Sequence, residues 1–421
     1  MKNRVEKILT IESLGHHGDG VARLDQKMIA VPYTLPGEEV RVEIVDHGQT
    51  RANLLDIIKA SPLRIPPSCP YFTVCGGCSL QHLDRESYRD FKANKIIGAL
   101  NQQGFQNITM NSIVYIPPNS RRRVSLKAHK TKSTVLLGYY KRESHDIVSI
   151  DCCPLVTPSI ETLITPLKSF CQKFFYKQEK AEILITDTQS GLDLIFKFKA
   201  PRELELHERE MLVEFARSQN LARLSIKSED TQETVVCFRQ PQVSFDQVMV
   251  DVEADSFLQV SELIDETLAK IIQAEIKSPC KRAADLFCGR GTLSLPLARF
   301  CPVDAYEMDP KALIALRKAI QASKRPIHIF ERNLFTNPLK EKELSGYDCV
   351  VLDPPRVGAF SQCKVLAKSN VPLVIMISCN PASFARDARE LVLGGYQMGP
   401  ITPLDQFLWS SHIELTASFR K

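Results

Sequence analysis

The sequence predicts a mixed α/β protein, and three features carry that prediction. Residues 282–287, 303–307 and 347–352 are apolar runs of strand length, and each ends in polar or conformationally special residues. A fourth run, residues 371–377, has the continuous aliphatic character of a buried parallel strand. At the start of the chain, short strand-like runs separated by glycine-bearing turns are typical of a small β-barrel. We therefore expect an open parallel sheet in the last third, a barrel at the start, and a central α+β domain between them.

Length and composition are those of a globular protein. The chain has 421 residues, 44% of them apolar and 24% charged, which predicts two or three domains. The start contains no apolar signal core, and the longest aliphatic run is far below the roughly 18 residues that span a bilayer. We expect a cytoplasmic monomer with no membrane partner. The 13 cysteines disfavour a disulfide scaffold, so they must serve as core residues, metal ligands or nucleophiles.

The first part of the chain is a separate unit of short strands. The expected strands are residues 7–13, 21–24, 28–33, 39–45 and 52–59, with glycines in the turns between them. This pattern favours a small barrel of oligonucleotide-binding type. The charges of the segment nearly balance, so any affinity for nucleic acid must come from the local placement of charge.

A cluster of cysteines follows this unit. Cys69, Cys75 and Cys78 are closely spaced, and Cys152 and Cys153 occur further along the chain. In a cytosolic protein such a density is typical of a soft-metal site. The spacing alone leaves zinc and an iron–sulfur cluster equally open.

The central domain combines helices and strands with a run of positive charge. The expected helices are residues 85–100, 159–176 and 202–218, and the expected strands are 124–129, 135–140, 182–186 and 192–198. The run, called here the basic strip, contains Arg121, Arg122, Arg123, Lys127, Lys130, Lys132, Lys141 and Arg142. Either it is a solvated hairpin with lysines on its edge, or it binds nucleic-acid phosphates.

A glycine turn and an acidic residue predict a nucleoside site. Gly289 and Gly291 lie in the turn after the first apolar run of the sheet, where the absence of a β-carbon lets a ligand approach the backbone. The next run ends at Glu307, and an acid about twenty positions after such a turn commonly binds ribose hydroxyls. A full Gly-x-Gly-x-x-Gly pattern is missing. A dinucleotide is therefore disfavoured, and a nucleoside such as S-adenosylmethionine fits better.

Two further strand ends carry candidate chemistry. Residues 347–352 end in Asp353, two prolines and Arg356, and the prolines fix the backbone of a loop that either holds a flat ring or is a surface turn. Residues 371–377 end near Cys379, which an Asn-Pro pair follows into an expected helix. Ligands of open α/β sheets bind at the carboxyl ends of the strands. Cys379 is therefore placed as a nucleophile, although small buried cysteines are common.

These motifs together resemble the RNA uracil-5 methyltransferase family. The resemblance is carried by Ser378-Cys379-Asn380-Pro381, Asp353-Pro354-Pro355-Arg356, Leu286-Phe287-Cys288-Gly289 and His412-Ile413-Glu414. More closely, they resemble its iron–sulfur-containing 23S ribosomal RNA branch. Residues 18–38 resemble a TRAM domain, an RNA-binding module, so the likeness covers essentially the whole chain.

The resemblance implies three domains and an activity. Residues 1–62 would be a TRAM-like RNA-binding barrel, residues 63–255 the cysteine loop and a central RNA-binding domain, and residues 256–421 a class I, Rossmann-like methyltransferase domain. The implied reaction transfers a methyl group from S-adenosylmethionine to carbon 5 of a uridine in 23S ribosomal RNA. Alternatives are 5-methyluridine formation in transfer RNA, RNA cytosine-5 methylation, and a non-enzymatic, cluster-bearing RNA-binding protein. Arg356 argues against cytosine, because RNA cytosine-5 enzymes usually carry a cysteine at that position.

The resemblance also implies the ligands of two cofactors. For S-adenosylmethionine they are Gln259, Phe287, Thr292, Glu307, Asn333 and Asp353. Thr292 and Ser261 depart from the family, in which asparagine is usual at both positions. For a [4Fe–4S] cluster the implied ligands are Cys69, Cys75, Cys78 and Cys153.

Two residues are implied to be catalytic. Cys379 would be the nucleophile, with a thiol pKa lowered by the helix N-terminus after Pro381. Glu414 would be the base. Phe257 is the candidate for packing against the target base, which must leave its stack to reach the thiol.

Overall fold

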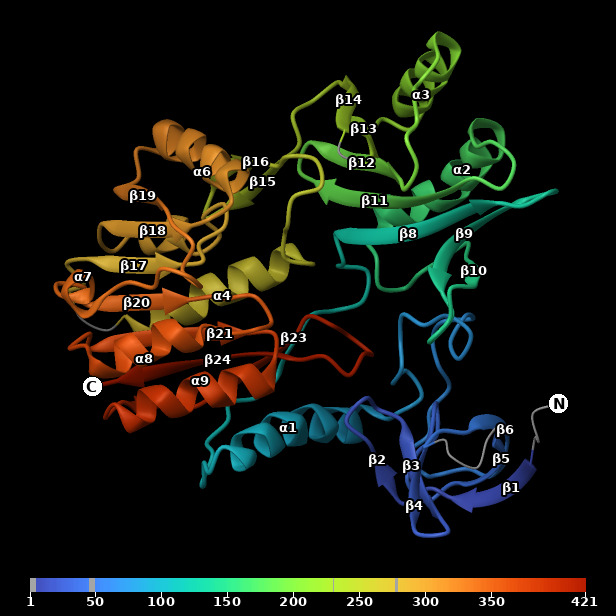
Figure 1. The fold of residues 1–421 in the computed structure, drawn as a ribbon, viewed down its shortest axis with the longest axis horizontal. Coiled ribbons are helices and arrows are strands. Elements are labelled where there is room, and N and C mark those ends of the chain that lie inside the picture. Colours follow the sequence, from blue (N-terminus) through green and yellow to red (C-terminus); the bar gives the residue numbers. More distant parts are fainter. Residues whose placement is uncertain (1–4, 45–49, 230, 277–278) are drawn as a thin grey trace. The chain divides into compact units, whose positions relative to one another are not determined.

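The computed structural model describes residues 5–44, 50–229, 231–276 and 279–421. The chain divides into two compact units (Figure 1). Unit 1 consists of Met1–Gly98, Tyr139–Val148 and Phe407–His412, and unit 2 of Ala99–Gly138, Ser149–Gln406 and Ile413–Lys421. Within the described residues, no helix is both long and apolar enough to cross a bilayer.

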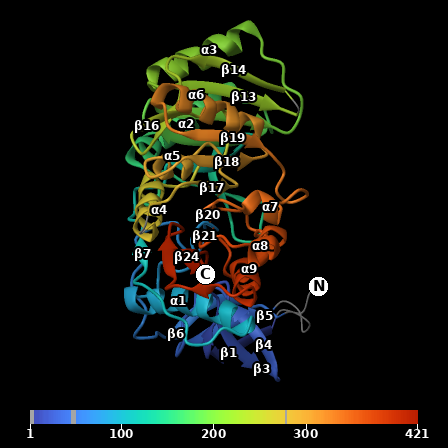
Figure 2. The ribbon, with the colours of Figure 1, turned by 90° about the vertical axis from the view of Figure 1, so that its left-hand side faces the viewer.

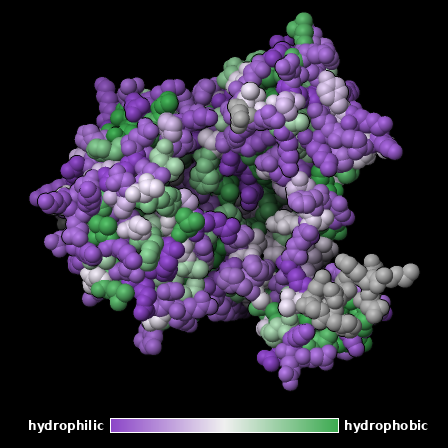
Figure 3. Space-filling view, in the orientation of Figure 1, coloured by the Kyte–Doolittle hydropathy of each residue, from purple (hydrophilic) through white to green (hydrophobic). Residues whose placement is uncertain are grey.

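Short antiparallel strands form the first part of unit 1. They are β1 (Val5–Thr10), β2 (Ser13–Leu14), β3 (Gly20–Leu24), β4 (Lys27–Val31), β5 (Glu39–Ile44) and β6 (Asn53–Lys59), paired in the orders β1-β5-β6 and β2-β3-β4. All five strands expected from the sequence are present, and the expected end of the fourth at Val45 lies outside the described residues. Leu9, Val40 and Val42 contribute to the core between the sheets. Other apolar side chains, such as Ile8 and Ile58, are exposed. Figure 3 shows hydrophobic areas at its lower right.

Helix α1 (Arg85–Gln102) holds the last segment of unit 1. The helix is capped by Asp84, whose carboxylate accepts the backbone N–H groups of Glu86 and Ser87. The buried Lys92 ammonium donates to the backbone carbonyl oxygens of Phe407 and His412. These two residues bound the segment Phe407–His412, which lies just before β24 (Glu414–Arg420) in the sequence.

A sheet with helices on one face forms the central part of the chain. Its strands are β8 (Arg123–Lys130), β9 (Val135–Tyr140), β10 (Ile147–Ser149), β11 (Lys180–Thr188), β12 (Gly191–Phe198), β13 (Arg223–Ser228) and β14 (Thr231–Cys237), in the order β10-β9-β8-β11-β12-β13-β14. Helices α2 (Pro158–Phe174) and α3 (Leu206–Ser218) pack against it through phenylalanines, with the rings of Phe170 and Phe215 stacked at 4.2 Å. The third predicted helix starts later than expected, because Glu205 is an extended N-cap residue.

The last part of unit 2 is built around a mostly parallel sheet. Its strands are β7 (Val114–Tyr115), β17 (Ala283–Leu286), β18 (Val303–Glu307), β19 (Ile327–Glu331), β20 (Cys349–Leu352), β21 (Leu373–Ser378), β22 (Gln397–Met398), β23 (Thr402–Asp405) and β24 (Glu414–Arg420). The order is β19-β18-β17-β20-β21-β24-β23-β7, and β22 also pairs with β24. Strands β17 to β21 are parallel, and β24 is antiparallel to β21. The α/β fold expected from the sequence is confirmed.

Helices cover both faces of this sheet. They are α4 (Glu262–Glu275), α5 (Ser294–Leu297), α6 (Pro310–Ser323), α7 (Glu341–Leu344), α8 (Phe360–Lys368) and α9 (Pro381–Leu393). Figure 2 shows the strands between α4 and α5 on one side and α7, α8 and α9 on the other. A hairpin of β15 (Gln242–Phe245) and β16 (Val248–Asp251) packs against α6. Helix α5 is short: it spans Ser294–Leu297 and contains Pro296, which lacks a backbone donor.

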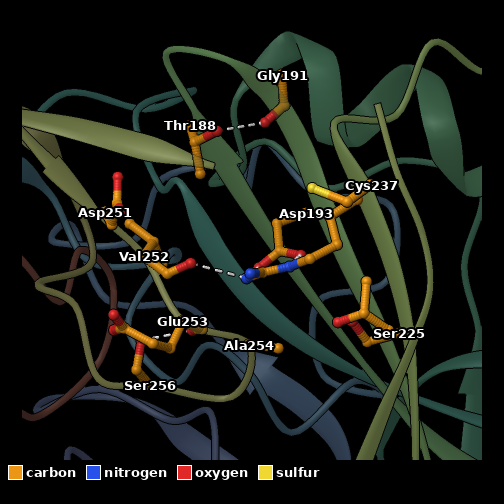
Figure 4. A network of polar contacts seen from close by, with 12 residues as sticks. Thr188, Gly191, Asp193, Ser225, Cys237, Asp251, Val252, Glu253, Ala254 and Ser256 are labelled. Carbon is orange, nitrogen blue, oxygen red and sulfur yellow. Dashed lines mark hydrogen bonds and ion pairs between the residues drawn. The ribbon is translucent and has the colours of Figure 1, made fainter. Parts of the chain in front are cut away.

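A group of polar contacts joins the central sheet to the segment that leads into the mostly parallel sheet (Figure 4). The buried Arg223 guanidinium binds Asp193 at 2.8 and 2.7 Å and donates to the backbone carbonyl of Val252 at 2.9 Å. From the other side, Arg290 donates to the carbonyl of Asp251 at 2.8 Å. Because Arg290 lies in the glycine turn after β17, this group of contacts ties the central sheet to the edge that carries the candidate site.

Candidate active site

The parallel register places the predicted site residues at one edge of the sheet. Leu286 is opposite Tyr306 on β18 and Leu352 on β20, and Leu352 is opposite Met376 on β21. Residues at or just after the ends of these strands therefore lie at the same edge, namely Phe287, Glu307, Asp353 and Cys379. Strand β24 runs in the opposite direction and begins at this edge with Glu414, beside the end of β21.

The turn after β17 is built for close approach to the backbone. Phe287 has a φ of 65°, which is rare for a residue with a bulky side chain and marks local strain. Gly291 has a φ of 95°, and a β-carbon there would lie 2.5 Å from Leu316 Cδ1. Thr292 follows in the same turn and is partly buried. A glycine is thus required at position 291 for two independent reasons.

Glu307 is fixed by backbone donors. Its carboxylate accepts N–H groups from Gly289 at 3.0 Å, Met308 at 2.7 Å and Asp309 at 2.9 Å. This arrangement holds a negative group beside the glycine turn, where it could accept ribose hydroxyls. The fixed carboxylate fits the role that the sequence assigns to it.

An aromatic pair lies near this carboxylate. The rings of Phe287 and Phe335 are 5.2 Å apart, and Asn333 Oδ1 accepts the backbone N–H of Phe335 at 3.0 Å. Phe335 is exposed, so its ring can pack against a planar ligand. Asn333 therefore fixes the backbone turn that carries Phe335.

Amide side chains connect Asp353 to Glu414. Gln259 Nε2 donates to Asp353 Oδ2 at 3.4 Å. Gln406 Nε2 donates to Gln259 Oε1 at 3.2 Å and also to Glu414 Oε2. Gln259, Gln406 and Glu414 are all buried. The methyl-donor candidates Gln259 and Asp353 and the predicted base are thus part of one hydrogen-bonded chain.

Cys379 is held at the end of β21 by the cap of α9. The Asn380 side chain accepts the backbone N–H of Ala382 at 3.2 Å and donates to the backbone carbonyl of Arg356 at 3.1 Å. This cap ties the cysteine turn to the loop that contains Asp353. Cys379 itself is partly buried. Phe257, the candidate for packing against a target base, is 70% exposed.

The thiol environment differs from the sequence-based prediction. Burial raises the pKa of Cys379, and the Glu414 and Asp353 carboxyls raise it further, while Arg356 acts in the opposite direction. The helix N-terminus after Pro381 does not outweigh these effects. The expectation of a lowered thiol pKa was therefore wrong for the protein without bound RNA.

The pKa values of three carboxyl groups near the site are raised as well. Burial raises the pKa of Glu414 well above its ordinary value, with further contributions from Asp353 and Asp265. Burial and the neighbouring Asp265 raise the pKa of Asp353 to about 7. Burial likewise raises the pKa of Asp265 to about 6, against the opposing effect of Arg122. These effects favour the protonated form of Glu414 in the free protein.

Arg122 does not belong to a surface strip. It is 5% exposed, its Nη2 donates to Asp265 Oδ2 at 2.5 Å, and its Nε donates to the backbone carbonyl of Gln259 at 3.0 Å. The interpretation of Arg122 as a phosphate contact was wrong, because its charge is used inside unit 2. There it supports the position of Gln259.

Other members of the basic strip also have partners within the protein. Lys127 pairs with Glu182 at 2.7 Å, and Lys130 donates to carbonyl oxygens near the end of α2. Lys132 is exposed. These contacts favour the hairpin interpretation for much of the strip, and phosphate binding stays a prediction for its exposed members.

The structure does not support the predicted metal site. In the parts of the chain that are described, no group of three or more His, Cys, Asp or Glu side chains is arranged to hold a metal ion. Cys69, Cys75 and Cys78 belong to unit 1, whereas the buried Cys153 belongs to unit 2. The iron–sulfur cluster therefore rests on the sequence resemblance.

Sequence reasoning missed several residues that complete the site. Gln406, Asp265 and Phe335 were not predicted, and Arg122 was assigned elsewhere. Phe335 lies two positions after Asn333, so the strand-end rule contained a signal for it. The other three act through partners more than seven positions away in the sequence, and a single sequence carries no such pairing.

Family models match two parts of the chain. A TRAM domain matches residues 3–47, and the model described as tRNA (Uracil-5-)-methyltransferase matches residues 206–421. An uncharacterized RNA methyltransferase of Mesorhizobium japonicum is 39% identical over 414 residues, covering 98% of this chain and 97% of the relative. The 23S rRNA (uracil(1939)-C(5))-methyltransferase RlmD of Shewanella sediminis is 29% identical and covers 98% of this chain and 95% of its own length.

A solved structure has the same fold. It is the Pyrococcus abyssi tRNA (uracil-54, C5)-methyltransferase in complex with S-adenosyl-L-homocysteine, with a TM-score of 0.74 and 22% sequence identity. The match covers 98% of this chain and 100% of that one. It supports the architecture described above.

Proposed function

Since this chain belongs to the RNA uracil-5 methyltransferase family, we propose that it methylates carbon 5 of a specific uridine through a covalent adduct on Cys379. The family membership makes the protein an S-adenosylmethionine-dependent RNA (uracil-5-)-methyltransferase. The covalent route and the identity of the RNA are the proposed part.

The chemistry of uracil explains why a thiol and a carboxylate are needed. Carbon 5 is too poor a nucleophile to take a methyl group directly. Addition of the Cys379 thiolate to carbon 6 converts carbon 5 into an enolate carbon, which can attack the methyl group. Glu414 then removes the hydrogen on carbon 5, the carbon 6–sulfur bond breaks, and the thiolate is released.

The pairing of β21 with β24 is the observation that carries this proposal. Ser378 is opposite Leu415 in this antiparallel pair. Cys379 and Glu414 are the next residues, at the edge of the sheet that carries the candidate site. The influence of the Glu414 carboxyl on the thiol pKa is a second sign of their closeness. A nucleophile and a base on neighbouring strands can act on adjacent ring atoms of one base.

The raised pKa values add a condition. Both Cys379 and Glu414 must lose a proton before they can act, and the pKa values of both groups are raised in the free protein. S-adenosylmethionine supplies the methyl group as a sulfonium, whose positive charge favours ionised carboxyls. Gln259, Glu307 and Asp353 are the residues proposed to hold it. We therefore place activation of the site after binding of methyl donor and RNA.

A trapping experiment tests the nucleophile. RNA containing 5-fluorouridine should form a stable adduct with the protein, because fluorine cannot leave as a cation. Cys379→Ala should form none, while Cys363→Ala, which removes a buried thiol of α8, should still form it. An adduct with Cys379→Ala would move the nucleophile elsewhere.

The proposed substrate is 23S ribosomal RNA. It is supported by the similarity to the Shewanella sediminis enzyme along nearly the whole chain. Transfer RNA is the alternative, supported by the description of the family model and by the Pyrococcus abyssi enzyme. Maps of 5-methyluridine in both RNA classes, from cells with and without the gene, should show loss at one 23S site. Loss in transfer RNA would favour the alternative.

Cytosine-5 methylation would use a similar adduct. Tritium release distinguishes the two activities, since RNA labelled at uracil carbon 5 should lose its label and RNA labelled at cytosine carbon 5 should retain it. The reverse result would overturn the assignment of uracil.

The remaining proposals concern the parts outside the methyltransferase domain. We propose that residues 1–62 and 63–255 are RNA-binding domains and that residues 256–421 form the catalytic domain.

A [4Fe–4S] cluster on Cys69, Cys75, Cys78 and Cys153 is proposed from the sequence resemblance. Anaerobically purified protein should then be brown and contain iron and sulfide, and replacement of any one ligand should bleach it. Colourless protein with stoichiometric zinc would refute the cluster.

A further inference from the structure

Gln406 is buried beside the predicted base. It follows β23 directly, is 6% exposed, and lies eight positions before Glu414. Its side-chain nitrogen donates to Glu414 Oε2 and, at 3.2 Å, to Gln259 Oε1. Both N–H groups of the amide are thus directed at residues of the site.

Gln259 is itself held from two sides. Its Nε2 donates to Asp353 Oδ2 at 3.4 Å, and its backbone carbonyl accepts from Arg122 Nε at 3.0 Å. In the hydrogen-bonded series Asp353–Gln259–Gln406–Glu414, Gln259 is therefore held in a fixed position. Movement of the Gln406 nitrogen away from Glu414 would also break the contact with Gln259.

The amide of Gln406 has one favourable orientation in this chain. Reversing it would place its oxygen against Gln259 Oε1, where two acceptors repel. In the observed orientation, the Gln406 oxygen is buried without a partner among the described residues. Such an oxygen is costly in a core, which favours a role in the reaction over a role in packing.

We infer that Gln406 is a positioning residue for the base: it holds Glu414 Oε2 and leaves Glu414 Oε1 to take the proton from carbon 5 of the methylated adduct. This inference rests on the proposed function. In the step concerned, Glu414 gains the carbon 5 proton, the C–H electron pair forms the carbon 5–carbon 6 double bond, and the carbon 6–sulfur bond breaks to return the Cys379 thiolate. Through Glu414, Gln406 acts on this step, because thiolate attack and methyl transfer need no carbon 5 base; the test therefore uses saturating S-adenosylmethionine, since Gln406 also bonds Gln259.

The test is a single-turnover experiment on Gln406→Met, which keeps the length of the side chain and removes the amide. The RNA carries tritium at uracil carbon 5, and S-adenosylmethionine carries a labelled methyl group. Methyl incorporation should change less than about 3-fold, while tritium release slows about 10- to 100-fold, part of the usual effect of a general base. The methylated covalent adduct should accumulate, and 5-fluorouridine RNA should trap the variant as fast as wild type.

Control variants separate positioning from damage to the fold. Gln362→Met removes another buried amide, which belongs to α8, bonds the backbone of Leu339 and lies outside the site. If this variant has any effect, it should slow methyl incorporation and tritium release by the same factor. If Gln406→Met does not fold, Gln406→Asn replaces it, and the same excess of methylated adduct is expected.

Each possible result of these experiments has a distinct meaning. Normal tritium release by the Gln406 variants, or an equal fall in both labels, would overturn the inference. Accumulation of methylated adduct by both Gln406→Met and Glu414→Gln would support it. If Glu414→Gln accumulates no adduct, the proposed function fails; if it does and Gln406→Met does not, the inference on Gln406 alone fails.

Discussion

Replacing Arg122 by methionine should destabilise the protein strongly. Arg122 and Asp265 have side chains that are 7% and 5% exposed, and they form an ion pair of 2.5 Å inside unit 2. The substitution leaves Asp265 buried without its cation and also removes a donor from the Gln259 carbonyl. Breaking a buried pair from one side costs about 3–5 kcal/mol, and we expect a loss in that range at pH 7.5.

The loss should depend on pH. The folded-state pKa of Asp265 is already raised to about 6 with Arg122 present, and it rises further without it. Above pH 6 the folded variant must therefore retain a proton that the unfolded chain releases, so its stability falls with pH relative to wild type. At pH 5, Asp265 is largely neutral in both folded proteins. The difference between them should accordingly be smaller at pH 5 than at pH 7.5.

Urea denaturation at both pH values measures this difference. Arg209→Met is the matched control, because Arg209 pairs with Glu233 on the surface and its loss should change the stability little at either pH. The double variant Arg122→Met with Asp265→Leu should recover part of the stability, since no unpaired charge remains. A loss below about 1 kcal/mol for Arg122→Met, equal at both pH values, would refute the buried-pair interpretation.

Three further predictions follow from the site. Glu307→Ala should weaken S-adenosylmethionine binding by about 1.5–3 kcal/mol, measured calorimetrically, with RNA affinity nearly unchanged; an equal loss of both would indicate misfolding. Because Cys379 and Glu414 both need to lose protons from raised pKa values, the single-turnover rate should rise between pH 6 and pH 8.5, and a flat profile would contradict this. Replacing Arg121 and Lys132 by alanine should reduce the salt dependence of RNA binding by up to about one unit of slope per lost phosphate contact; an unchanged slope would leave the strip as a solvated hairpin.

Strand-end residues could be located from the sequence because their signal is local. A continuous apolar run identifies a buried strand, and its last polar residue marks the edge where ligands bind. Glu307, Asp353 and Cys379 were found in this way, and Phe287 came from the family resemblance. The register of β17, β18, β20 and β21 brings the four residues together. The place of Glu414 came from the family resemblance, and its antiparallel pairing with β21 appears in the structure.

The burial of individual side chains and their charged partners could not be predicted from such local patterns. The basic strip is a uniform pattern in sequence, yet the Arg122 guanidinium is buried because Asp265 lies opposite it. A pattern of charge does not reveal a partner that is distant in the chain. The prediction of a lowered Cys379 pKa was wrong for the same reason. A helix N-terminus can be recognised in the sequence, whereas the combined effect of burial, Glu414 and Asp353 on the thiol cannot.

The state of the Glu414→Gln enzyme after one turnover tests the central claim most directly. If Cys379 attacks carbon 6 and Glu414 acts only after methyl transfer, this variant should accumulate an RNA adduct that survives denaturing gels. Intact mass should show that the adduct already carries the transferred methyl group, and digestion should place it on Cys379. Normal turnover by Glu414→Gln, or an adduct without the methyl group, would contradict the account.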